Sequence, residues 1–223
     1  MTTHAKGLLA VWTDIEPAAE AEFNQWYDRE HLPERAAVPG FLNARRYGAV
    51  QAAPRYFAAY DTESLAVLGS PTYVKALGNQ TAWSQRMFTN FRNNTRMIAA
   101  QPTERGVGIG GAMLTVRLAP GVGGAAALAE GLARVVETAA ELSGIVRISV
   151  ALGVVAGLDA DPTQPARLAA ERPDAVALLV EGTDVPPLQA AVASPLSEAA
   201  LLAAGAERIL QHGYYRMLCT VVA

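Results

Sequence analysis

His31 is the side chain of this sequence best suited to moving a proton near neutral pH, because an unperturbed imidazole titrates at about 6.5. Asp28 comes three residues earlier, so in a helix its carboxylate lies one turn away and can orient the ring. We therefore take His31 as a candidate general acid or base and Asp28 as its catalytic partner. The alternative is a structural histidine that caps the end of a helix and pairs with Asp28 or Glu34.

Two arginines follow at positions 45 and 46. A guanidinium can hold a carboxylate or a developing enolate, so we assign Arg45 to catalysis and Arg46 to substrate binding. An arginine pair on a strand more often gives one salt bridge and one solvated side chain. Aromatic side chains usually belong to the core, but those of this half can also line a pocket for an aromatic substrate. The candidates are Trp26, Tyr27, Tyr47, Tyr60 and Trp83.

Composition excludes several other classes of function. The formal net charge is −3 and no Lys/Arg-rich run occurs, so we expect no nucleic-acid partner. No apolar run reaches membrane-spanning length and the first residues do not resemble a secretion signal, so we expect a cytoplasmic protein with no membrane partner. The histidines at 4, 31 and 212 lack metal-ligand spacing, and we expect no metal.

The elements that carry these residues can be read along the first half. Pro33 disfavours helical geometry at Leu32, which predicts that His31 ends a helix beginning near Ala18. Pro39-Gly40 predicts a turn, and the strand after it alternates so that one face is polar enough for a pocket. The predicted elements are a strand over 6–14, a helix over 18–31, strands over 41–50 and 55–62, helices starting near 63, 70 and 81, and a strand over 95–100.

The second half repeats this order after the glycine-rich segment 103–111. Gly106 to Gly111 fits G-x-G-x-x-G but precedes a strand, so it predicts a hinge between domains and not a phosphate site. The predicted elements are strands over 112–118, 145–155, 175–180 and 214–222, a helix over 128–142, helices within 187–209, and a surface loop over 157–172. Three local echoes support a duplication: 39–41 with 143–145, 70–71 with 194–195, and 96–98 with 216–218.

The repeat predicts an α+β fold made of a tandem ferredoxin-like βαββαβ repeat, whose two antiparallel sheets pack into an α+β barrel. We expect residues 1–105 to form the unit that carries the site and residues 106–223 to form a mainly structural unit. All three tryptophans and all five phenylalanines precede residue 92, and the second half has no histidine that matches His31.

The dense stretch also resembles a known family. The patterns N-x-W-Y-D at 24–28, H-L-P-E at 31–34, V-P-G-F at 38–41 and A-R-R-Y at 44–47 look like the EthD-like group of the dimeric α+β-barrel superfamily. The resemblance implies ferredoxin-like units that pair into a barrel, and it implies small cofactor-free enzymes such as cyclases, dehydratases, isomerases and monooxygenases, or accessory proteins. Some relatives with two units per chain bind haem. His31 matches the histidine of the family's motif, which is often its proposed acid or base.

We therefore expect a small cofactor-independent enzyme of lyase, cyclase, dehydratase or isomerase type, in which His31 transfers a proton on a hydrophobic carbonyl or aromatic substrate. The alternatives are a non-catalytic ligand-binding or accessory protein of a catabolic or biosynthetic pathway, and a haem-binding barrel protein with His31 or His212 as the axial ligand. The expected partner is a small hydrophobic molecule, and a homodimer is a further possible assembly.

Overall fold

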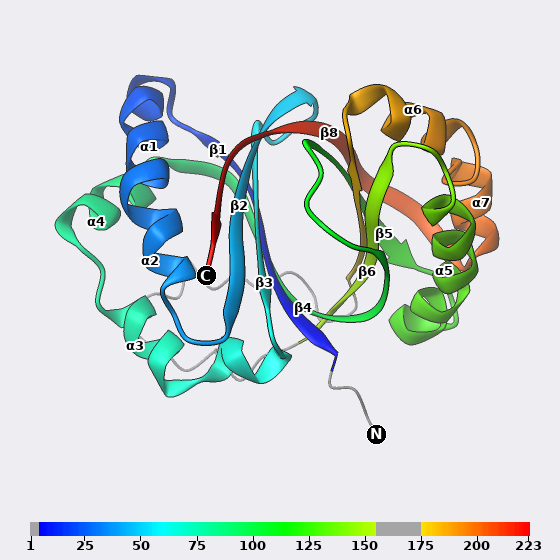
Figure 1. Cartoon of the computed structure of the whole chain (residues 1–223), viewed down its shortest axis with the longest axis horizontal. Coiled ribbons are helices and arrows are strands. Elements are labelled where there is room, and N and C mark those ends of the chain that lie inside the picture. Colours follow the sequence, from blue (N-terminus) through cyan, green and yellow to red (C-terminus); the bar gives the residue numbers. More distant parts are fainter. Residues whose placement is uncertain (1–4, 155–174) are drawn as a thin grey trace.

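The structure, a computed structural model, describes residues 5–154 and 175–223. Its strands form one closed barrel in the order β1-β3-β2-β8-β5-β7-β6-β4, with β4 pairing back onto β1. Helices cover the barrel on two opposite sides (Figure 1). The surface loop predicted over 157–172 lies outside the described residues.

The first half contributes four strands and the helices of one side. They are β1 (Lys6–Ile15), η1 (Pro17–Ala19), α1 (Glu20–Trp26), the π-helical turn η2 (Tyr27–His31), α2 (Leu32–Ala36), β2 (Phe41–Gln51), β3 (Tyr56–Thr62), η3 (Leu65–Gly69), α3 (Pro71–Gly78), α4 (Ala82–Thr89) and β4 (Phe91–Gly106). Ser70 and Thr81 cap α3 and α4 through their side-chain oxygens.

The second half contributes the other four strands and the helices of the opposite side. They are β5 (Ala112–Pro120), α5 (Gly124–Ala140), β6 (Ile145–Gly153), β7 (Val176–Gly182), α6 (Val185–Ala193), α7 (Glu198–Ala203) and β8 (Ala206–Val222). Among the described residues, none of the helices combines the length and apolar character needed to cross a membrane.

The predicted tandem ferredoxin-like fold is confirmed by the strand order. Each half forms a sheet with its fourth, first, third and second strand side by side, and the halves join where β2 pairs β8 and β4 pairs β6. The glycines at 40 and 144 both adopt a positive φ, of 90° and 83°, immediately before the second strand of each half. Both of these strands then show the same register shift near their start.

Strand register corrects two of the three local echoes. Gly7 pairs with Thr62 and Ala100, whereas Ala112 pairs with Gly182 and Arg216, so Arg216 is the counterpart of Ala100. The counterpart of Arg96 is His212, opposite Val116. The Ser194-Pro195 pair lies between helices, and the residue that caps α7 is Ser197.

The helix around His31 does not end where the sequence predicted. Leu32 keeps helical dihedrals of φ −64° and ψ −49°, and the chain stays helical to Ala36. Leu32 donates its N–H to the carbonyl of Tyr27, five residues back, so the wider π-helical turn immediately precedes Pro33 and the helix continues past a residue that has no N–H to donate. The prediction that His31 ends the helix is therefore wrong.

The second correction concerns the end of the chain. Helices were predicted as far as Ile209, but α7 ends at Ala203 and β8 begins at Ala206. Gly205 adopts a φ of 110° and turns the chain into this long strand. His212, expected in a turn, is therefore an exposed residue within β8.

Three apolar clusters hold the molecule together. One lies between the helices and the sheet of the first half, the second lies under α5, α6 and α7, and the third fills the barrel. The barrel cluster contains large fully buried side chains, among them Trp12, Tyr47, Phe57 and Tyr215. The interior of the barrel is thus packed with side chains and leaves little room there for a ligand.

Candidate functional site

His31 lies between the helices and the sheet of the first half and is surrounded by aromatic rings. Its imidazole stacks on Trp26 with 4.4 Å between ring centroids and an interplanar angle of 27°. Tyr27, Phe88 and Tyr60 meet the imidazole edge-on at 5.1, 5.9 and 6.4 Å. The side chain is half-buried, and the aromatic rings fix the orientation of its plane.

The π-helical turn explains this arrangement. In an α-helix, residues five apart point in different directions, so Trp26 and His31 would lie on different faces. A π-helical turn bonds residue i to i+5, which brings residues five apart one above the other. Trp26 and His31 are five residues apart across η2, so the π-helical turn directs the His31 side chain toward the sheet.

A second set of contacts locks Trp26 in place. Its indole Nε1 donates to Ser84 Oγ at 3.0 Å and to Glu30 Oε1 at 3.1 Å. The hydroxyls of Ser84 and Thr81 donate to the same carboxylate oxygen, at 3.0 and 2.6 Å. Glu30 therefore ties the π-helical turn to α4, and sequence spacing gave no sign of this contact because it joins segments more than 50 residues apart.

Tyr60 and Tyr27 supply hydroxyl groups beside the imidazole. Both are buried, and burial raises the pKa of each phenol, that of Tyr60 well above its usual range. Within the described part of the chain, the Tyr60 hydroxyl makes no hydrogen bond of normal length, but the Tyr27 phenol interacts with it and raises its pKa further. Tyr60 also contacts Phe41, with 6.3 Å between ring centroids.

Arg35 is the site residue that the sequence reasoning did not nominate. It follows His31 by four residues and is only 2% exposed. Within 5–154 and 175–223 its ion-pair partner is Glu34, the adjacent residue, at 3.0 Å from Nη2, and none of its three guanidinium nitrogens makes a hydrogen bond there. Arg35 favours ionisation of both Tyr27 and Tyr60 and so partly offsets the effect of burial on the pKa of each. The spacing of four residues from His31 could have identified Arg35 as a site residue from the sequence.

Arg96 adds a second buried cation to the same layer. It is 8% exposed, and its Nη2 donates to the hydroxyl of Tyr73 at 3.2 Å. Tyr73 also packs against Phe41, with 5.4 Å between ring centroids. The layer thus combines one imidazole, two guanidinium groups and three phenols.

Arg46 and Asp28 form an ion pair. The Arg46 guanidinium lies over the rings of Phe23, Tyr27 and Tyr56, at 5.2, 4.8 and 5.0 Å from their centroids. Its Nη1 donates to Asp28 at 3.0 Å, and its Nη2 donates to Asn24. Arg46 is therefore enclosed by the protein itself, and the half-exposed Asp28 carboxylate serves it as an acceptor.

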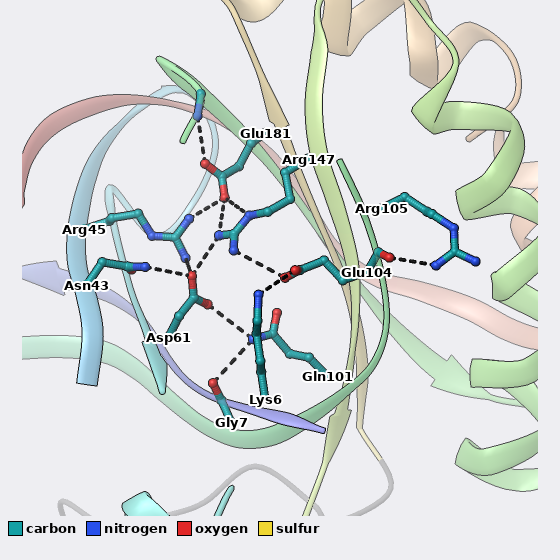
Figure 2. A network of polar contacts seen from close by, with 11 residues as sticks. Lys6, Gly7, Asn43, Arg45, Asp61, Gln101, Glu104, Arg105, Arg147 and Glu181 are labelled. Carbon is teal, nitrogen blue, oxygen red and sulfur yellow. Dashed lines mark hydrogen bonds and ion pairs between the residues drawn. The ribbon is translucent and has the colours of Figure 1, made fainter. Parts of the chain in front are cut away.

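Arg45 and Tyr47 face the barrel interior, on the opposite side of β2 from Arg46. Figure 2 shows Arg45 between the carboxylates of Asp61 and Glu181. Its Nη2 donates to Asp61 at 2.7 Å. Tyr47 is fully buried and packs on Phe57. The structure therefore does not bring Arg45 and Tyr47 together with His31, and one site cannot use all three side chains.

The interior network couples the two halves through charge. Arg147 of β6 donates to Asp61 of β3 at 2.8 Å and to Glu181 of β7 through Nε at 2.8 Å (Figure 2). Burial alone would raise the pKa of Asp61, but Arg45 and Arg147 outweigh it and lower that pKa to about 2. The polar face predicted on β2 is thus filled by ion pairs where a pocket was expected.

Trp83 lies at the margin of the His31 layer. It is half-buried on α4 and packs against the first-half cluster.

A shallow apolar groove of about 490 Å³ opens at the α2–β2 corner. Phe41, which contacts Tyr60, is one of its lining residues, and the full set is Pro33, Ala36, Ala37, Val38, Pro39, Gly40, Phe41, Val221, Val222 and Ala223.

The second half lacks this chemistry at equivalent positions. Leu9 pairs with Tyr60 in the first half, and its counterpart Leu114 pairs with Val180 in the second. Among the described residues of the second half, the layer under α5 to α7 is filled by aliphatic side chains that are at most 8% exposed, with Tyr214 as its one buried aromatic. In the part of the chain that the structure describes, the polar constellation around His31 therefore belongs to the first half.

The two histidines considered as axial haem ligands lie in different surroundings: His31 is half-buried among four aromatic rings, and His212 is exposed on β8. Within 5–154 and 175–223, no group of three or more His, Cys, Asp and Glu side chains is arranged to hold a metal ion.

Comparison with solved structures finds the same fold in proteins of very different sequence. An anthrone oxidase-like protein matches with a TM-score of 0.70 and 11% identity, over 100% of this chain and 94% of its own. A putative monooxygenase from Fusobacterium nucleatum gives 0.65 and 8%, over 100% and 96%. A putative chlorite dismutase gives 0.57 and 9%, over 97% and 96%. No family model and no curated protein matches the sequence. At these identities the likeness establishes the fold, a ferredoxin-like α+β barrel.

Proposed function

We propose that this chain is a small acid–base enzyme of the EthD-like kind, which works without a cofactor and removes a proton from carbon next to an aromatic carbonyl group. The observation that carries the proposal is the setting of His31. One imidazole is fixed by a π-helical turn against Trp26, next to two buried phenols and a buried guanidinium. π-helical turns occur frequently at functional sites.

The roles follow from the contacts. His31 takes the proton from carbon and returns it to carbon or oxygen, while Trp26, Tyr27 and Tyr60 hold the imidazole and the flat substrate. The negative charge then moves onto the carbonyl oxygen as an enolate, which buried donors stabilise. The apolar groove beside Phe41 offers a surface for the body of the substrate, and its volume falls in the range of about 300–1,000 Å³ typical of small-molecule pockets.

This proton abstraction is the first step shared by isomerases, cyclases and cofactor-free oxygenases. The solved structures of similar fold include an anthrone oxidase-like protein, so anthrone is a reasonable first probe. A lyase or isomerase would return the proton, whereas an oxygenase would let the enolate react with dioxygen. The aromatic setting of His31 favours substrates of this class over aliphatic ketones.

Deuterium exchange tests the proposal directly. Anthrone and 1-phenylbutane-1,3-dione, each in deuterated buffer under argon, are followed by NMR with wild type, His31→Gln and no protein. We expect wild type to exceed His31→Gln by about 10²- to 10⁴-fold. His212→Gln, which changes an exposed histidine, is the matched control and should exchange like wild type.

Two results would contradict the proposal. One is a folded His31→Gln protein that exchanges both probes at the wild-type rate. The other is a wild-type protein that binds anthrone but leaves its exchange rate at the level of buffer, which would favour the non-catalytic ligand-binding function. Oxygen uptake in air then separates an oxygenase from an isomerase or lyase.

A further inference from the structure

Arg35 is buried with hydrogen-bond donors that no acceptor within the described protein satisfies. A guanidinium has five N–H donors and stays charged, yet Arg35 is 2% exposed and none of its nitrogens makes a hydrogen bond there. A buried donor left without an acceptor costs about 1–3 kcal/mol, and more when it is charged. Arg45 and Arg46, equally buried, both have carboxylate acceptors.

Glu34 does not remove this imbalance. It is the neighbouring residue in the sequence, and its Oε2 atom, 3.0 Å from the guanidinium, also lacks a hydrogen bond among the described residues. The pair therefore attracts through charge but without hydrogen-bond geometry. An incoming oxygen would give Arg35 the acceptor that Glu34 does not supply.

Tyr60 is a second, independent group with the same need. It comes from β3 and not from the helix, it is 1% exposed, and its hydroxyl makes no hydrogen bond of normal length in the part of the chain that the structure describes; the Tyr27 phenol is the neighbouring group that raises its pKa further. Arg35 follows His31 by four residues and so lies on the same face of the helix, and the His31 ring meets the Tyr60 ring at 6.4 Å between centroids, which places Arg35 and Tyr60 in one layer. Buried polar groups without partners are uncommon in native proteins and call for a ligand or ordered water.

We propose that Arg35 and Tyr60 form a binding site for a single anionic oxygen on an aromatic ligand, an enolate, phenolate or carboxylate. This inference rests on the proposed function for the role of the oxygen, because the same pair would receive the negative charge when His31 removes a proton. The positive side chain supplies charge and the phenol supplies a directed donor. The second half has Val180 in place of Tyr60, so the site occurs once in the tandem fold.

Binding of ligands that do not react tests the site separately from catalysis. We compare 2-naphthoate with the neutral 2-naphthamide by calorimetry. Wild type should bind the carboxylate at least tenfold more tightly than the amide. Arg35→Gln should lose that preference and keep its affinity for the amide, and Tyr60→Phe should lose part of it. Arg86→Gln, at an exposed arginine, should behave as wild type.

Stability gives a second readout. Because Arg35 lacks acceptors, Arg35→Met should melt at or above the wild-type temperature, whereas a structural arginine would lower it. Equal affinities for the two probes, no binding of either, or a preference that survives in Arg35→Gln would each overturn the anion site and leave ordered water as the partner. Deuterium exchange that persists in that event would leave the proposed function standing.

Discussion

Replacement of Asp61 by asparagine should destabilise the protein far more than loss of an exposed carboxylate. Asp61 is 1% exposed and accepts hydrogen bonds from Arg45 and Arg147, at 2.7 and 2.8 Å. Asp61→Asn leaves two buried guanidinium groups to share Glu181. Breaking a buried ion pair from one side costs about 3–5 kcal/mol, and we expect the free energy of unfolding to fall by that amount.

The pH dependence gives this prediction a signature. The pKa of Asp61 is lowered from 3.8 to about 2, so the carboxylate stabilises the fold above the unfolded value and loses that contribution as the pH falls toward 2. The corresponding energy is about 2 kcal/mol. Asparagine does not titrate, so the gap between wild type and Asp61→Asn should narrow by about this amount between pH 4 and pH 2.

Urea unfolding at several pH values, followed by tryptophan fluorescence, measures both effects. Asp184→Asn is the matched control, because Asp184 pairs with Arg216 on the surface and both side chains are more than half exposed. That change should cost about 0–1 kcal/mol. An Asp61→Asn loss below about 1 kcal/mol, or a gap that stays constant from pH 7 to pH 2, would refute the assignment of the network as a stabilising charge cluster.

Two further predictions concern packing. Arg46→Gln removes a guanidinium enclosed by three rings and should cost about 2–4 kcal/mol in chemical denaturation, whereas Arg55→Gln, at a side chain that is 64% exposed, should stay within about 0.5 kcal/mol of wild type. Gly131→Ala should lower the melting temperature although alanine is the better helix former, because the added methyl carbon would lie 2.0 Å from the carbonyl oxygen of Ala204; we expect a cost of about 1–3 kcal/mol. Gly78→Ala, with no atom within 4 Å of the new methyl group, is the control and should keep or raise the melting temperature; a drop as large as that of Gly131→Ala would show that the contact with Ala204 is not the cause.

The architecture was predictable because both halves show the same order of predicted strands and helices and the same kind of turn residues. Pro39-Gly40 and Ser143-Gly144 each place a glycine where the chain needs a positive φ, and the strands after them alternate clearly. The residue-by-residue pairing of the strands could not be predicted from the sequence. The echo of Arg96 at Arg216 looked convincing in the sequence, yet the pairing of strands puts His212 at that place.

The choice of His31 as the centre of the site stays a prediction, and the surroundings of this residue could not be predicted from the sequence. Alternation along β2 separates Arg45 from Arg46, but it cannot tell which face closes a barrel, because that depends on strands more than 100 residues away. The π-helical turn has no sequence signature of its own, and without it Trp26 and His31 point apart. The sequence did not identify Arg35, because only the folded structure shows that its guanidinium nitrogens are buried without hydrogen-bond acceptors.

The covalent joining of the two halves allows something that two identical chains cannot achieve. Asn43 and Arg147 occupy equivalent register positions, as do Asp61 and Glu181, yet each pair differs in charge or length. In a symmetric pair of single-unit chains, every substitution appears twice, and Arg147 could not face Asp61 without a second arginine at the position of Asn43. One continuous chain lifts that constraint, so each half can specialise while the closed barrel is kept.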